Sequence, residues 1–121
     1  MGLKASLRKE RVAEVQRIAR SLSREGMTWS APFAAILTAA AANAVGDEAS
    51  AVRALRSAID LAERADMRGY VAASQYQLGS LIGGDEGQKL KETAEERMIA
   101  QGVRVPPRFA ATLVPGRWGT G

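Results

Sequence analysis

Few residues of this sequence could carry out chemistry. Its 121 residues include no cysteine and no histidine. The chain therefore lacks thiolate nucleophiles, thiolate metal ligands and the side chain best suited to proton transfer near neutral pH. Asp60, Glu63 and Asp66 share one predicted helix, point outward and have no base or metal ligand beside them. We therefore expect no enzyme activity, no catalytic residues, no metal site and no cofactor.

A glycine-rich turn is the next candidate. The run Gly83-Gly84-Asp85-Glu86-Gly87 opens a predicted helix, and helix amino ends bind anions. Two acidic residues already lie there, however, and no Gly-Lys-Ser/Thr follows as a phosphate-binding loop requires. The pattern therefore favours a turn in which Asp85 caps the helix, with Gln88 at the capping-box spacing.

Polar residues on apolar helices form a candidate partner groove. Tyr76 shares a helical face with Gly69 and Ala73, so its ring either anchors a partner's peptide or fills space left by small neighbours. Thr38 and Asn43 interrupt an apolar helix, and each is expected to bond a backbone carbonyl or face solvent, with ligand binding as the alternative. The candidate groove comprises Thr38, Asn43, Tyr76 and Ser80.

Basic residues concentrate in the first predicted helix, residues 3–25. It holds seven Lys/Arg against three Glu, and 17 basic and 13 acidic residues overall leave ten of each elsewhere. Such a helix could bind nucleic acid, but Glu10 and Glu14 are interleaved and no aromatic side chain could stack on bases. A solvated helix is favoured, with nucleic-acid binding as the alternative. The candidate basic patch is Arg8, Lys9, Arg17, Arg20 and Arg24.

Apolar spacing, glycine stops and proline starts predict an all-α chain of stacked antiparallel helical hairpins. We expect one helical-repeat domain over residues 1–116. It would comprise the basic helix at 1–25, a hairpin at 28–65 with its turn at Gly46, a second hairpin at 67–102 and a capping helix at 106–114. Thr28 or Ser30 would cap the first hairpin, with Pro32 in its first turn, and Asp47 would cap its second helix.

Periodic apolar residues predict the core, and the end of the sequence is expected to be a flexible tail at 117–121. Trp118 would then be disordered or dock on a partner, whereas Trp29 would pack at the entry to the first hairpin. The core candidates in the third, fourth and fifth predicted helices include Val52, Leu55, Ile59, Ala62, Val71, Leu78, Leu81, Ile82, Leu90, Ala94, Met98 and Ile99.

The most apolar stretch, residues 31–46, is Ala-rich, contains Thr38 and Asn43, and is shorter than the about 20 residues of a membrane span. We therefore expect a buried core helix there. Lys4, Arg8 and Lys9 interrupt any early apolar run, so no secretory signal is expected. A cytoplasmic location without membrane contact follows as the default.

An internal repeat relates the two predicted hairpins. Residues 34–65 and 72–101 each contain a helix, a glycine turn and a second helix, and Gly-Asp-Glu recurs at 46–48 and 84–86, 38 positions apart. Periods near this value are typical of helical-hairpin repeats, whose members bury their apolar faces by stacking.

Motifs over most of the chain resemble one bacterial family. They read ADMRGYVAA at 65–73, LGSLIGGDEG at 78–87, MIAQG at 98–102, PR at 107–108 and LVPG at 113–116, with WSAP at 29–32 and GD at 46–47 upstream. This pattern resembles the C-terminal tetratricopeptide-like region of large bacterial serine/threonine protein kinases and related ATPase regulators. In that family such repeats follow a kinase domain and a nucleotide-binding section, and are expected to bind proteins or transmit regulation.

The sequence departs from this family in two respects. It contains none of the kinase motifs, so the resemblance implies no kinase activity for this chain. The tetratricopeptide consensus is also partial, because Gln75 replaces the expected Trp before Leu78-Gly79 and the period of 38 exceeds the usual 34. The resemblance therefore implies tetratricopeptide-like hairpins in a signalling protein.

These patterns predict a non-catalytic interaction or regulatory module. It would present a concave face, made by the helices near 31–46 and 67–82, to a protein partner or to other domains of a larger protein. The Met start permits a complete short protein, yet the helix at 3–25 could equally be half of a longer hairpin. An apolar edge left on that helix would favour a homodimer.

Overall fold

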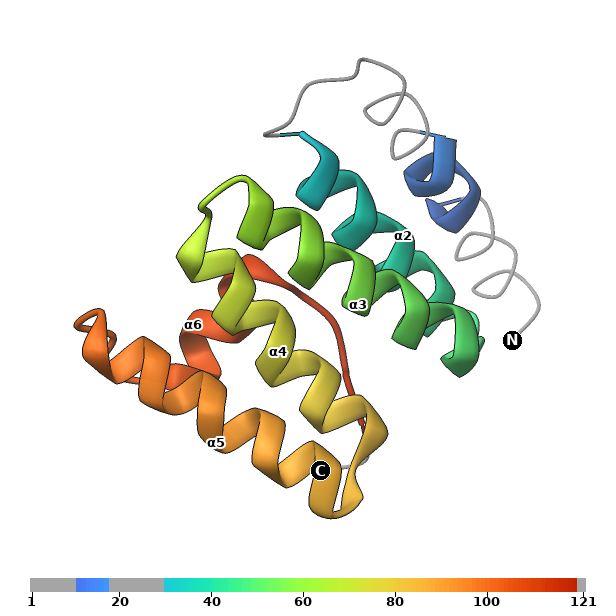
Figure 1. The fold of residues 1–121 in the computed structure, drawn as a ribbon. Coiled ribbons are helices and arrows are strands. Elements are labelled where there is room, and N and C mark those ends of the chain that lie inside the picture. The colour runs from blue at the N-terminus through green and yellow to red at the C-terminus, as the bar shows by residue number, and fades with distance from the viewer. Residues whose placement is uncertain (1–10, 18–29, 120–121) are drawn as a thin grey trace.

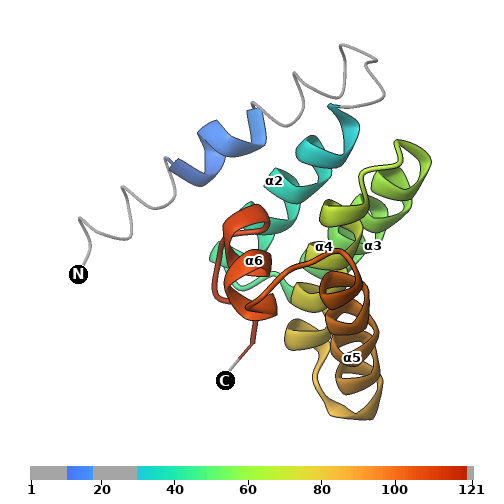
Figure 2. The same cartoon turned by 90° about the vertical axis from the view of Figure 1, so that its left-hand side faces the viewer.

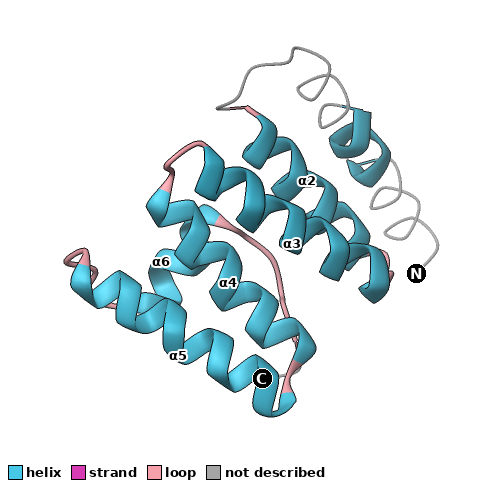
Figure 3. Cartoon of the chain, viewed as in Figure 1, coloured by secondary structure: helices cyan, strands magenta, loops and turns pink. Residues whose placement is uncertain are grey.

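The structure is a computed structural model that describes residues 11–17 and 30–119. These residues form helices and turns, without a strand. Residues 11–17 are helical. The later helices are α2 (Ala31–Ala44), α3 (Glu48–Arg64), α4 (Arg68–Ile82), α5 (Gly84–Ala100) and α6 (Pro106–Leu113) (Figures 1 and 3). The all-α prediction is confirmed. No helix in the described ranges is long and apolar enough to cross a membrane.

Consecutive helices run in opposite directions, and each packs on the next: α2 on α3, α3 on α4, and α4 on α5 (Figure 1). The chain then turns back, and α6 packs chiefly on α4 (Figure 2). Helix α4 therefore has neighbours on three sides. This explains why even its polar residues Ser74 and Gln77 are buried.

Local sequence signals set most of the helix ends. The Asp47 side chain accepts a hydrogen bond from the Ser50 backbone N–H at 3.2 Å, which confirms the predicted cap of α3. Ser30 is the residue before α2, and Pro32 lies in its first turn as predicted. Pro106 similarly opens α6. Thr28 and Trp29 lie outside the described residues.

Helices α2, α3 and α5 end in the same backbone motif. A residue of positive φ is followed by a residue whose N–H bonds the carbonyl of the fifth residue before it. The positive-φ residues are Gly46, Asp66 and Gly102, with φ of 79°, 57° and 89°. The closing bonds run from Asp47, Met67 and Val103 to the carbonyls of Ala42, Ala62 and Met98.

The turn between α4 and α5 corrects two predictions. Gly83 alone, with φ 63° and ψ −164°, ends α4 and precedes α5, so Asp85 lies inside the first turn and does not cap the helix. Gln88 makes no capping box but donates to Glu92 Oε1 at 3.3 Å. The two Gly-Asp-Glu triplets therefore differ in structure, because only the first forms a turn followed by a cap.

Small side chains dominate the core. Leu55, Leu78, Met98 and Val114 are its largest fully buried hydrophobic side chains, and most other buried positions are alanines. Val52 and Ile59 are only partly buried, because α3 centres its inner face on Leu55 and the alanines around it. The prediction for Ile99 is wrong. It is 63% exposed because α5 packs through Gly87, Ala94 and Met98, and Ile99 lies on another side of the helix.

Candidate interaction surface

The segment after α6 lies against α4 and reaches the end of α2. The carbonyl of Val114 accepts hydrogen bonds from Gln77 Nε2 at 3.1 Å and from Trp118 Nε1 at 3.0 Å. Asn43 Nδ2 donates to the carbonyl of Arg117 at 2.8 Å. We call residues 115–119 the strap; Figure 1 shows it running beside α4.

The strap corrects the prediction of a flexible tail. Trp118 is only 5% exposed and belongs to the hydrophobic core. It is therefore packed within its own chain and is neither exposed to solvent nor available to dock on a partner in this structure. The backbone of Gly119 closely approaches the Ser80 carbonyl, where a Cβ would not fit. Residues 117–119 are thus held by contacts from both α2 and α4, while residues 120–121 lie outside the described part.

The four predicted groove residues have different surroundings. Thr38 is exposed and its hydroxyl donates to the Ala34 carbonyl at 2.9 Å. Ser80 likewise donates to the Tyr76 carbonyl at 3.2 Å. The Thr38 bond fits the predicted alternative in which this side chain bonds a backbone carbonyl, and Ser80 follows the same local rule. Among the hydrogen bonds of the described residues, only that of Asn43 joins one of these four side chains to another segment, and that segment belongs to the same chain.

Tyr76 and Ser80 come together at a cavity of about 450 Å³ beside the strap. The Lys91 ammonium lies 5.1 Å from the centroid of the Tyr76 ring, a cation–π geometry. Thr38 and Asn43 do not line this cavity. Its lining consists of Tyr76, Gly79, Ser80, Gly83, Gly84, Gln88, Lys91 and Trp118. Sequence reasoning missed Gln88, Lys91 and Trp118, since no local pattern places them beside Tyr76.

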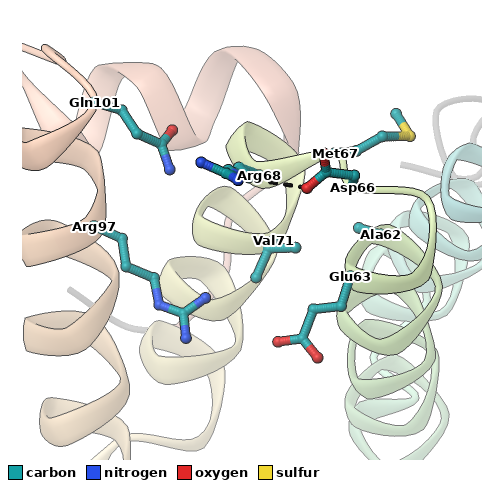
Figure 4. Close-up of a pocket in the computed structure, with 8 residues that line it drawn as sticks. All are labelled: Ala62, Glu63, Asp66, Met67, Arg68, Val71, Arg97 and Gln101. Atoms are coloured by element: carbon teal, nitrogen blue, oxygen red, sulfur yellow. Dashed lines mark hydrogen bonds and ion pairs between the residues drawn. The ribbon is translucent and has the colours of Figure 1, made fainter.

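A second cavity of about 290 Å³ lies where the end of α3, the start of α4 and the end of α5 meet (Figure 4). Arg97 and Glu63 extend toward one another from opposite walls, and Asp66 Oδ1 lies 3.4 Å from Arg68 Nε. The described lining therefore holds two acidic and two basic residues, whose formal charges sum to zero. Val71 lies between Arg97 and Glu63 in this view (Figure 4).

The acidic residues weighed as chemical candidates face solvent, as predicted, but the prediction that they share one helix is wrong for Asp66, which lies in the turn after α3. Asp60, Glu63 and Asp66 are exposed, and Asp60 pairs with Arg64 at 3.0 Å. Within residues 11–17 and 30–119, no group of three potential ligands could hold a metal ion.

The candidate basic patch is largely outside the described residues. Arg17 is exposed on the helical stretch 11–17. Arg8, Lys9, Arg20 and Arg24 lie outside it, as does most of the helix predicted to form a dimer.

Comparisons with known proteins leave the family open. No family model matches the chain, and no curated protein or solved structure gives a significant match.

Proposed function

We propose that this chain is a non-catalytic, tetratricopeptide-like module that binds a protein segment or another domain of a larger protein. It would serve in bacterial signalling, as the resemblance to the C-terminal region of serine/threonine kinases implies. The architecture supports this proposal. Helices α2 and α3, and then α4 and α5, are consecutive packed pairs, and α3 joins the two pairs by packing on α4.

One observation carries the proposal: α2 and α4 already hold a segment that is neither helix nor strand. Asn43 binds a backbone carbonyl of the strap, Gln77 binds the carbonyl just before it, and Ser80 meets its last described residue. We call Asn43, Gln77 and Ser80 the strap face. A surface that orders one polypeptide through backbone contacts has the chemistry to bind another.

Tyr76 marks the place where a partner would bind beside the strap face. It is a partly buried aromatic residue at the edge of an open cavity, a setting typical of residues that dominate binding energy. Among the described residues that line that cavity, Lys91 is the only charged one; it lies over the Tyr76 ring and would favour a partner with a carboxylate nearby.

Site-directed crosslinking tests this function. A photoreactive amino acid at Tyr76 should capture a partner in the native cell, while the same group at Ile99, exposed on α5 away from the strap, should not. The captured protein would then be purified and titrated against the chain. Tyr76→Ala should weaken binding about tenfold or more, with the helical circular dichroism unchanged. Equal capture at both positions, or equal affinity of Tyr76→Ala and Ile99→Ala, would contradict the proposal.

Nucleic-acid binding through the basic helix is the second candidate. Its support is that both described arginines of that helix, Arg11 and Arg17, are exposed. It requires an affinity for DNA or RNA that falls steeply as the salt concentration increases. The reason is that basic side chains displace salt cations from the phosphates on binding, and this release is less favourable at high salt. A fluorescence titration at two salt concentrations, repeated with Arg17→Gln, separates it from the first candidate.

A further inference from the structure

We propose that the strap is releasable: residues 115–119 undock from Asn43 and Ser80 while the helices stay folded, and an extended protein segment binds in their place. The undocking is a property of this chain alone, whereas the exchange for a partner rests on the proposed function. The strap would then regulate access to the surface that it covers.

The strap is held by few contacts. Within it only Trp118 is buried, while Pro115, Gly116, Arg117 and Gly119 are exposed. The hydrogen bond from Asn43 to the Arg117 carbonyl is exposed, so water can replace it at little loss. Docking therefore fixes the backbone of five residues, and each loses conformational entropy. The main contribution that opposes this loss is the burial of one indole.

The helices have their own support. Val114, which precedes the strap, stays with α6 because its N–H bonds the Ala110 carbonyl at 2.8 Å. Helix α4 packs on α3, α5 and α6 independently of the strap. Segments with few buried contacts open more readily than the core that supports them. Release of the strap therefore leaves the helical core in place.

Two glycines allow the strap to pivot. Gly116 and Gly119 have φ of 136° and 113°, values that L side chains rarely adopt, and they flank Arg117 and Trp118. Val114 stays with α6, and Gly116 is only two residues after it. Rotation about the backbone bonds of Gly116 therefore moves the rest of the strap away from α4. Gly119 is required for docking, because a side chain there would meet the Ser80 carbonyl.

The same contacts define the segment that could replace the strap. The Val114 carbonyl accepts an indole N–H, Asn43 donates to a backbone carbonyl, and Ser80 leaves no room for a side chain after the indole. The occupant that fits is an extended protein segment in which an aromatic donor is followed by glycine, as Trp118 is followed by Gly119.

Hydrogen exchange of the full chain tests the release without any partner. The Trp118 indole N–H should exchange at least about tenfold faster than the backbone N–H groups of Val71–Leu78 in α4, because the strap opens alone. Tryptophan fluorescence is a second probe, because Trp29→Phe removes one of the two tryptophans and leaves Trp118 alone. Its fluorescence should then report exposure at a lower urea concentration than the loss of helical circular dichroism. Equal exchange rates, or coincident urea transitions, would overturn the inference.

A pair of glycine variants separates release from unfolding. Gly119→Ala should accelerate the Trp118 exchange about tenfold more and leave the exchange in α4 unchanged. Gly102→Ala is the control, because its φ of 89° imposes similar strain while nothing lies within 4 Å of the added Cβ. It should accelerate the exchange in α4 and leave the Trp118 exchange largely unchanged, because the indole N–H already exchanges through the opening of the strap alone. If Gly119→Ala accelerates both probes equally, the strap is an integral part of the core.

The crosslinking and hydrogen-exchange experiments can contradict the binding function and the strap release independently of each other. Coincident opening of Trp118 and α4 overturns the strap and leaves the proposed binding function standing. Independent opening without any partner captured at Tyr76 overturns the binding function and leaves a strap that opens.

Discussion

Gly79 of α4 and Gly87 of α5 bring their backbones into direct contact, since a Cβ at either position would collide with the carbonyl oxygen of the other. The Cβ of an alanine at Gly79 would lie 2.5 Å from the Gly87 oxygen and 3.1 Å from the Lys91 nitrogen. The one-residue turn at Gly83 holds the two helices at this short separation.

Gly79→Ala should therefore destabilise the protein. Alanine in a helix interior normally gains roughly 0.5–1 kcal/mol over glycine, but forcing the backbones apart should produce a net loss of about 2 kcal/mol. Urea unfolding followed by circular dichroism measures this change. Gly69→Ala in the same helix is the control, because its Cβ would meet a Phe109 side-chain atom at 3.3 Å, and that side chain can move. A more stable Gly79→Ala protein would contradict the close approach.

Asp66→Gly should stabilise the protein. Asp66 is the only non-glycine residue with positive φ in the described ranges, at 57°. Glycine removes this backbone strain, a gain of about 1 kcal/mol. The lost ion pair with Arg68 matters little, because the two side chains are 77% and 82% exposed. Asp66→Asn, which tolerates the same conformation, should be near neutral in the same urea titration. A destabilised Asp66→Gly protein would show that the carboxylate matters more than the strain.

Ser74→Ala should also raise stability. The Ser74 hydroxyl is fully buried and has no hydrogen-bond partner in the described part of the chain. Removing an unsatisfied buried hydroxyl should gain about 1 kcal/mol. Thermal unfolding of Ser74→Ala and of Ser80→Ala compares this hydroxyl with one that already bonds the Tyr76 carbonyl. A clear loss of stability at Ser74 would indicate a bond that forms in solution.

Protonation of Asp47 should weaken the fold in acid. Hydrogen bonds from Ser50, first from its side chain and then from its backbone N–H, lower the pKa of this carboxyl, and Arg53 adds to the effect. A lowered folded pKa means that the ionised group stabilises the folded state fully above its ordinary pKa, about 3.9. That contribution is lost as the pH falls through the lower folded value.

The urea midpoint measured from pH 7 downward checks this expectation. The advantage of the native protein over Asp47→Asn, which keeps a capping oxygen but does not titrate, should shrink below about pH 4. Adding Ser50→Ala to both proteins should make the difference in their urea midpoints smaller. This substitution removes the side-chain donor to the Asp47 carboxylate and keeps the backbone N–H donor. A difference that stays constant with pH would mean that the carboxylate charge does not contribute.

The amino-acid sequence by itself determined the helices and most of their ends. Helix periodicity, the Asp47 cap, the stop at Gly46 and the prolines at the starts of α2 and α6 are local signals, and they act within a few residues. The absence of His and Cys is likewise a property of the sequence. The bonding of Thr38 and Ser80 to their own helices also follows a local rule, as predicted for Thr38.

Only the tertiary structure decided which surfaces are covered. Asn43 and Arg117 are bonded across 74 positions, and Trp118 is buried although its sequence neighbours suggest an open tail. No periodic pattern encodes such contacts, because they depend on where α6 returns against α4. Ile99 illustrates the same limit: it is apolar at a helical spacing, yet the close approach at Gly79 and Gly87 fixes how α5 is rotated and leaves Ile99 outside.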